Sequence, residues 1–171
     1  MLFPWSHAPT EASDLTGKVA FYATLESVVD HCPKRDTLRL LEDFNASTGT
    51  ERDGYETCFG PHGSGTVNQN ITKFLDFARS QGLWVAGSWF QCPQAHRWTW
   101  YSNAGGVAKE IDHVLVDCRW RMIQNCRVYQ SAHFLNTDLR LVAATLKLQL
   151  NSVRWYHPSL GWMLASSRMG E

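Results

Sequence analysis

Neither sign of charge prevails in this sequence, which holds 16 Lys and Arg against 16 Asp and Glu in its 171 residues. A chain without net charge has no overall positive field to attract nucleic acid, so a DNA partner would need a local basic patch. The start of the sequence also lacks the basic segment and the unbroken apolar run of a secretory leader, because Pro4 and Ser6 interrupt it. No apolar stretch approaches the length of about 20 residues that spans a membrane. These absences predict a nuclear or cytoplasmic protein without a membrane partner.

The cysteine spacings of a disulfide framework or a common zinc finger are absent as well. The five cysteines form no Cys-x-x-Cys pair and their number is odd, which favours reduced thiols in an intracellular protein. A zinc site is the alternative, although the spacing of its four candidate ligands matches no familiar pattern. Those ligands would be Cys92, His96, Cys118 and Cys126.

Apolar residues are plentiful, at 44% of the chain, and eight of them are tryptophans. They can build one sizeable core or an aromatic surface. Apolar residues recur at helical spacing in 15–32, where Thr16 would cap the helix, and in 68–81. Between them lies a polar loop at 46–66, and 119–129 fits either a helix or a strand.

Strands are predicted wherever apolar residues alternate or form short continuous runs. In the last of these strands, Leu139 and Leu141 face one way and Arg140 and Val142 the other. Two helices among many strands predict an α+β fold with packed sheets. The predicted strands are 37–41, 83–90, 96–102, 108–117 and 138–150.

Three aspartates lie inside predicted strands or at their ends, far apart in the sequence: Asp43, Asp112 and Asp138. Carboxylates at strand ends can converge on one sheet edge, where they bind a hard cation such as Mg²⁺ and activate water for phosphoryl chemistry. The alternative is that these aspartates only belong to polar turns. The spacing alone leaves both interpretations open.

Several stretches, in order along the chain, carry a resemblance to a known family. The sequence resembles the endonuclease/exonuclease/phosphatase superfamily, and within it the endonuclease domain of non-LTR retrotransposon reverse-transcriptase proteins, including the craniofacial development protein 2 group. The longest and most specific block is "HRWTWYSNAGGVAKEIDHVLVD". The other matching stretches are "HAPTEASDL", "LLEDFNASTGTE", "GPHGSG" and "NTDLRLVAATLKL".

The resemblance implies a DNase I-like fold, which is a four-layer αββα sandwich with its active site between two sheets. The family domain begins well before the "APT" stretch. Residues 1–150 are therefore expected to form a partial sandwich, truncated at its N-terminus. Residues 151–171 do not resemble the family and are expected to be a divergent, disordered tail.

The resemblance also implies a site and a reaction, the Mg²⁺-dependent hydrolysis of a phosphodiester in DNA. Asp43 and Asn45 match the family's Asp-x-Asn pair, which activates the attacking water and holds the phosphate. Asp112 would support catalysis, and Asp138 matches the aspartate of a final Ser-Asp-His motif. The implied Mg²⁺ ligands are Asp43, Asn45 and Asp138, and the implied phosphate-binding residues are His7, Asn45 and Thr99.

The sequence departs from this pattern at functional positions. Leu139 stands where the family has its final His, and a leucine can neither donate a hydrogen bond nor carry charge. Glu42 replaces a glycine next to the phosphate site, and the family's main Mg²⁺-binding glutamate would precede this chain. We therefore expect a retroelement-derived endonuclease domain that is inactive or strongly impaired. The alternative is a non-catalytic remnant that binds DNA or protein.

Two further groups of residues allow a nucleic-acid interpretation and a structural one. Trp98 or Trp100 is expected to fill the core between the sheets, with stacking on a base as the alternative. Arginines around Trp120 are expected to form a solvated face, with contact to a DNA backbone as the alternative. These arginines are Arg119, Arg121 and Arg127.

Leu139→His is not expected to restore nicking of supercoiled plasmid by itself. The substitution returns one hydrogen-bond donor, but the glutamate that the resemblance expects for Mg²⁺ is still missing. A gel assay of plasmid nicking in Mg²⁺ would check this. Recovered nicking would contradict the inferred importance of the missing glutamate.

Overall fold

The computed structural model describes residues 8–33, 38–120, 122–130 and 138–147. His7 and the predicted tail at 151–171 lie outside these ranges. Short 3₁₀ turns cover Ala86–Trp89, Gln94–His96 and Cys118–Trp120. The helices and strands are α1 (Leu15–Asp30), β1 (Arg39–Asp43), α2 (Ile71–Ser80), β2 (Leu83–Val85), β3 (Trp100–Tyr101), β4 (Ala108–Lys109), β5 (Asp112–Asp117), β6 (Ile123–Tyr129) and β7 (Leu141–Leu146).

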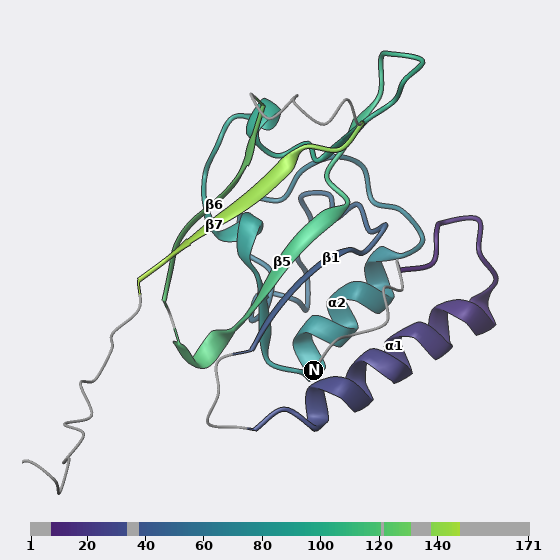
Figure 1. Ribbon diagram of the computed structural model, residues 1–171, viewed down its shortest axis with the longest axis vertical. Helices are drawn as coiled ribbons and strands as arrows, with labels where there is room; N and C mark the ends of the chain where they lie inside the picture. Colours follow the sequence, from purple (N-terminus) through teal and green to yellow (C-terminus); the bar gives the residue numbers. More distant parts are fainter. Residues whose placement is uncertain (1–7, 34–37, 121, 131–137, 148–171) are drawn as a thin grey trace, which may run out of the picture.

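Strand β5 forms the centre of an antiparallel sheet with the order β1-β5-β2. Its residues Val114, Leu115 and Val116 are at most 5% exposed, so the strand is buried on both faces. Helices α1 and α2 lie together on one side of this sheet (Figure 1). Leu115 packs there with Phe74 and Phe77 of the amphipathic helix α2. This contact between helices and sheet is the larger of the two cores.

Strands β6 and β7 form the layer on the other side of β5 (Figure 1). Val114 and Val116 pack against Cys126 of β6 and against Val142 of β7, and so form the second core. Strands β3 and β4 pair with each other, and an antiparallel bridge from Trp100 to Leu139 joins this pair to the segment that enters β7. This bridge links the β3–β4 pair to the β6–β7 pair, and the two pairs together are called the second sheet.

The structure confirms a mixed α/β fold with antiparallel sheets. Its described part has three layers, one of helices and two of strands (Figure 1). The second helix layer of the expected sandwich is not found among the described residues. Neither α1 nor α2, the two long helices of the described ranges, is long and apolar enough to cross a membrane.

Some predicted elements need correction. The strand expected at 83–90 ends at Val85, because the Ser88 hydroxyl donates a 2.6 Å hydrogen bond to the Val85 carbonyl and closes a 3₁₀ turn. The strand expected at 96–102 is reduced to Trp100–Tyr101. Asp14 caps α1 in place of Thr16, since its carboxylate accepts from the Gly17 N–H at 3.2 Å. The ambiguous segment 119–129 is mostly β6.

Phe74→Ala is expected to lower the free energy of unfolding by about 3–5 kcal/mol, because Phe74 is 0% exposed and its loss leaves a cavity. A urea titration followed by tryptophan fluorescence would measure the loss. Val19→Ala on α1, where the side chain is 50% exposed, serves as the control and should change stability by less than about 1 kcal/mol. Equal losses in the two variants would contradict the placement of the core.

Candidate active site

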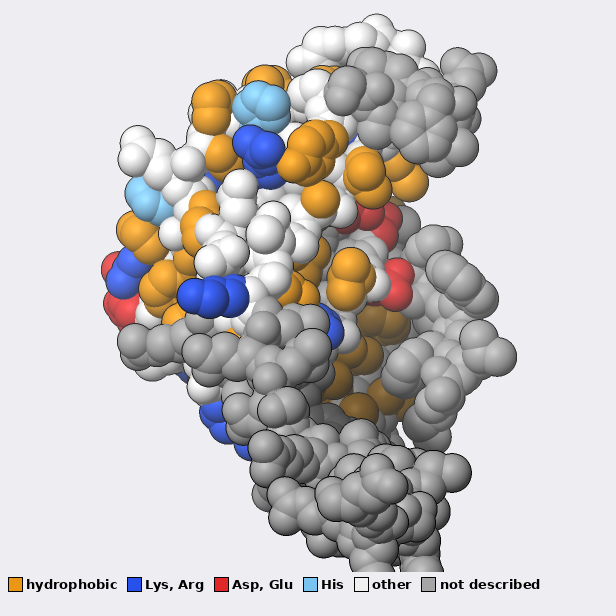
Figure 2. Space-filling model, turned by 60° about the vertical axis from the view of Figure 1, so that its left-hand side comes forward, with side chains coloured by type: hydrophobic (Ala, Val, Ile, Leu, Met, Phe, Trp, Pro, Cys, Tyr) orange, Lys and Arg blue, Asp and Glu red, His pale blue; other side chains and the backbone are white. Residues whose placement is uncertain are grey.

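A groove of about 610 Å³ opens where β1 ends, between the two sheets and the segment that leads into α1. Asp43, Asn45 and Asp138, which the sequence predicts as metal ligands, all line it. They come from positions up to 95 residues apart, so only the fold brings them together. Figure 2 shows red carboxylate side chains beside orange hydrophobic ones at the margin of a hollow in the surface. The other residues that line the groove are Thr10, Glu11, Ala12, Asn68, Trp100, Lys109, Ile111 and Leu139.

Asn45 adopts a left-handed backbone conformation, with φ of 47°. Among residues other than glycine, asparagine is one of the few that tolerate this region. The Asn45 N–H donates to Asp43 Oδ1 at 2.8 Å, and the Asn45 side-chain amide donates to the Ala8 carbonyl at 2.8 Å. The two groove residues are thus fixed to each other by a tight local turn. Backbone strain of this kind is common at functional sites.

Two more asparagines hold this turn in place. Asn68 and Asn70 donate from their side-chain amides to the Asn45 carbonyl at 2.7 and 3.0 Å. Asn70 also donates to the Pro9 carbonyl at 2.9 Å, and Asn68 Oδ1 accepts from the Ser47 N–H at 3.1 Å. The sequence interpretation missed both residues, because they were assigned to the start of a helix. Two asparagines at the end of a Gly-rich loop, just before a helix, could have indicated a role in holding this turn.

Asp138 is positioned by a tryptophan. The indole N–H of Trp100 donates to Asp138 Oδ2 at 2.8 Å, and the Tyr101 N–H donates to the Asp138 carbonyl at 3.0 Å. Trp100 is half-buried and lines the groove, and Trp98 is half-buried as well, so the expectation that one of them fills the core between the sheets is corrected. The indole N–H explains this placement, since a buried tryptophan needs a partner for it.

Asp112 lies directly opposite Asp43 in the β1–β5 ladder. The Phe44 N–H donates to the Ile111 carbonyl, so the next pair, Asp43 and Asp112, is of the closer, non-hydrogen-bonded type. Two carboxylates in such a pair repel each other. Asp112 lines a small cavity between the sheets together with His113, Cys126 and Val142.

The structure does not bring Thr99 to the groove. Thr99 is 1% exposed, and its hydroxyl accepts from the N–H groups of Ile111 and Asp112 at 3.0 and 3.2 Å. These hydrogen bonds from the backbone to Thr99 fix the start of β5. His7, which is also predicted to bind phosphate, lies outside the described residues. Glu42 does not line the groove either, since its neighbour across the ladder is His113.

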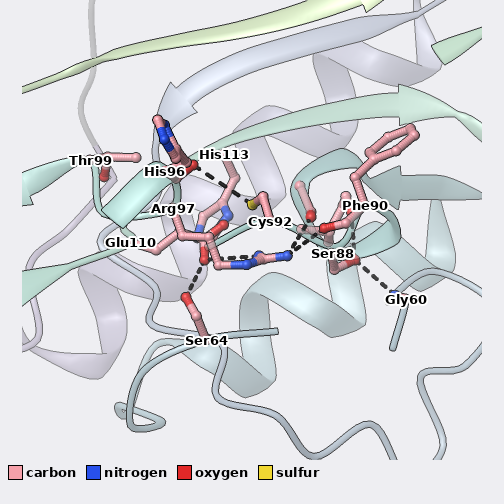
Figure 3. A network of polar contacts seen from close by, with 12 residues as sticks. Gly60, Ser64, Ser88, Phe90, Cys92, His96, Arg97, Thr99, Glu110 and His113 are labelled. Carbon is pink, nitrogen blue, oxygen red and sulfur yellow. Dashed lines mark hydrogen bonds and ion pairs between the residues drawn. The ribbon is translucent and has the colours of Figure 1, made fainter. Parts of the chain in front are cut away.

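A buried polar network links Arg97, Glu110 and Ser64 (Figure 3). Glu110 accepts hydrogen bonds from the Ser64 hydroxyl and from Arg97, whose guanidinium also donates to the carbonyls of Gly87 and Phe90 at 3.1 and 2.8 Å. His113 is bonded at 2.7 Å to the Ala46 carbonyl, directly after Asn45. The loop at 46–66 is thereby tied to both sheets.

No group of three or more His, Cys, Asp or Glu side chains in the described ranges is arranged to hold a metal ion. The two groove carboxylates and Asn45 are hard oxygen donors of the kind that Mg²⁺ prefers, and they would need water and substrate oxygens to complete its coordination. The alternative zinc site is not assembled, because Cys118 lines a separate cavity from Cys92, His96 and Cys126. All five cysteines are free, and burial raises the pKa of Cys126 to about 12.

No protein-family model matches the chain. The fold is similar to that of the 3′-5′ exonuclease NExo from Neisseria meningitidis, with a TM-score of 0.57 and 23% identity over 78% of this chain and 54% of that chain. A second structure, of the 3′ phosphatase NExo bound to a product DNA hairpin, gives a TM-score of 0.58 and 21% identity over the same shares. At such identities the likeness shows the fold alone.

The sequence is similar to craniofacial development protein 2. It is 29% identical to that protein of Tragulus javanicus over 147 residues, which are 85% of this chain and 25% of the relative. The protein of Bos taurus is 27% identical over 148 residues, or 86% of this chain and 24% of the relative. The chain thus spans about a quarter of the length of these relatives.

Arg97→Met is expected to lower the free energy of unfolding by about 3–5 kcal/mol, because it leaves the Glu110 carboxylate buried without its cation. The double variant Arg97→Met/Glu110→Gln should lose clearly less, since no unpaired charge is then buried. Urea titrations of both variants would compare them. A double variant that is as unstable as the single one would contradict the assigned role of the charge.

Proposed function

We propose that this chain is a phosphodiester-hydrolysing domain that acts on DNA with Mg²⁺ in the groove at Asp43, Asn45 and Asp138. The observation that carries the proposal is the convergence of these three predicted residues on one groove. The likeness in fold to a nuclease and 3′ phosphatase supports it. An ancestor among retroelement endonucleases is part of the proposal, supported by the resemblance of the block at 96–117.

The arrangement of carboxylates supports a bound cation. Asp43 lies opposite Asp112 in a close cross-strand pair and shares the groove with Asp138. A divalent cation would offset the repulsion between these groups. Asp43, Asp138 and the Asn45 side-chain oxygen would hold it. When bound, Mg²⁺ neutralises charge on the phosphate and acidifies its water.

The hydrogen bonds of the groove suggest what each residue does. Asp43 Oδ1 accepts from the Asn45 N–H, so the other oxygen of Asp43 would hold the cation, and the attacking water bound there would lose its proton more readily. The water oxygen forms a bond to phosphorus as the bond to the leaving oxygen breaks. Lys109, which lines the groove, supplies positive charge for the phosphate.

The leucine at position 139 predicts slow hydrolysis in the groove. It is 41% exposed and lines the groove, at the position where the resemblance implies a histidine. A missing preorganised donor of this kind typically lowers the rate about 100- to 1000-fold. The same observation favours the second candidate function, a groove that binds DNA without cleaving it.

Asp43→Asn and Asp138→Asn are each expected to lower the rate of DNA nicking in Mg²⁺ by about 100-fold or more, because each removes a charged oxygen from the groove. The rate would be measured on supercoiled plasmid, with EDTA as the metal-free reference. Asp76→Asn, at an exposed ion pair on α2, is the matched control and should keep the parent rate.

Three outcomes decide between the two candidates. Nicking that is lost in both groove variants but kept in the control supports hydrolysis in the groove. Nicking that survives both substitutions overturns it and points to a contaminating nuclease. DNA retention without any nicking in the parent chain favours the binding function.

A further inference from the structure

The face of the second sheet that points away from β5 is here called the outer sheet face. Its members follow from register, since Trp100 pairs with both Lys109 and Leu139, Leu141 pairs with Tyr129, and Ala143 pairs with Arg127. Residues two apart on a strand share a face. The described residues of this face are Trp100, Val107, Lys109, Asn125, Arg127, Tyr129, Leu139, Leu141, Ala143, Thr145 and Lys147.

The outer sheet face is unusually apolar for an exposed surface. Leu141 is 55% exposed, Val107 49%, Leu139 41% and Tyr129 39%. These four are half of the large hydrophobic side chains that are exposed in the described part of the chain. Contiguous apolar surface of this kind marks an interaction site more often than scattered residues do.

The charge on the outer sheet face has one sign. Its exposed Lys109, Arg127 and Lys147 are cations, and none of its described residues carries a carboxylate. The Arg127 guanidinium lies 4.8 Å from the centre of the Tyr129 ring and donates to its hydroxyl at 3.0 Å. A cation thus lies beside an aromatic ring at Arg127 and Tyr129, and Lys109 is paired with Trp100 across β3 and β4.

The combination of exposed apolar side chains with positive charge indicates which kind of ligand the outer sheet face would bind. A second copy of the chain would place cations against cations, so self-association on this face is unfavourable. A polyanion with flat apolar groups fits better, because phosphates can meet the cations while bases stack on the rings. A duplex keeps its base faces stacked inside, whereas a single strand presents them.

The outer sheet face is also continuous with the candidate active site. Trp100, Lys109 and Leu139 belong to this face and line the groove that holds Asp43 and Asp138. A strand that lies on the face would therefore lead directly to the carboxylates.

We propose that the outer sheet face binds a single-stranded segment of nucleic acid next to the phosphodiester in the groove. Bases stack on Trp100 and Tyr129 and cover Leu139 and Leu141, and phosphates contact Lys109, Arg127 and Lys147. This inference rests on the proposed function and adds a substrate class to it, DNA with an unpaired strand beside the cleavage point.

The test is fluorescence anisotropy of a labelled 20-nucleotide single-stranded DNA with the full chain in EDTA, where nothing is cleaved. Tyr129→Ser should weaken binding about tenfold through the loss of stacking. Arg127→Gln should lower the slope of log affinity against log salt by about 0.7, the value for one phosphate contact on a single strand. Asp76→Asn, at the exposed ion pair on α2, should leave binding intact.

A matched control exists on α2, where the Arg79 guanidinium lies 4.8 Å from the centre of the Tyr55 ring. Tyr55→Ser and Arg79→Gln should change neither the affinity nor the salt slope. A urea titration of each variant shows that the fold is intact, and the exposed Arg127→Gln keeps the test valid if Tyr129→Ser is unstable.

Parent-like binding by both Tyr129→Ser and Arg127→Gln would overturn the proposal. So would equal affinity for a blunt duplex, or a dimer in sedimentation that Leu141→Ser disperses. Failure of the proposed function looks different, since Asp43→Asn would then leave nicking unchanged while single-strand binding still depended on Tyr129.

Discussion

The pairing of β1 with β5 is the constraint on which the rest of this structure depends. Because β5 is buried on both faces, the register of its partner admits little slippage, since a shift by one residue would turn every side chain to the opposite face. That register places Asp43 opposite Asp112 and lets the chain leave β1 through the strained turn at Asn45. The clustering of like charges at the groove is thus a consequence of burying an apolar strand.

Some polar groups around this turn stabilise the fold, and others line the groove where chemistry is proposed. Asn68 and Asn70 donate to the Asn45 carbonyl, and the buried Arg97 bonds to backbone carbonyls and to Glu110, so these groups fix the loop. Asp43 accepts from the Asn45 N–H and Asp138 from the Trp100 indole, and both carboxylates line the groove. Leu139 is the apolar exception in this groove, and it joins the groove to the outer sheet face.

The two faces of the second sheet show how alternation in one strand serves two purposes. Val142 and Ala144 pack inward on β5, whereas Leu141 points outward and is 55% exposed. A polar residue at Leu141 would have been enough for solubility alone. Its apolar side chain, beside Tyr129 and Arg127, gives the face a chemistry that a solvated sheet does not need.

The sequence by itself determined those helices, strands and turns that depend on residues close together along the chain. The apolar spacing of 68–81 predicts α2, the run at Val114–Val116 predicts a buried strand, and the stretch from Asp43 to Asn45 at a strand end identifies a candidate site. Only the tertiary structure decided which distant residues complete that site. Asn68, Trp100 and Lys109 reach the groove through strand register and loop closure, which no window along the chain contains. Thr99 shows the converse, since its pattern pointed to the site, while cross-strand hydrogen bonds commit its hydroxyl to the backbone of β5.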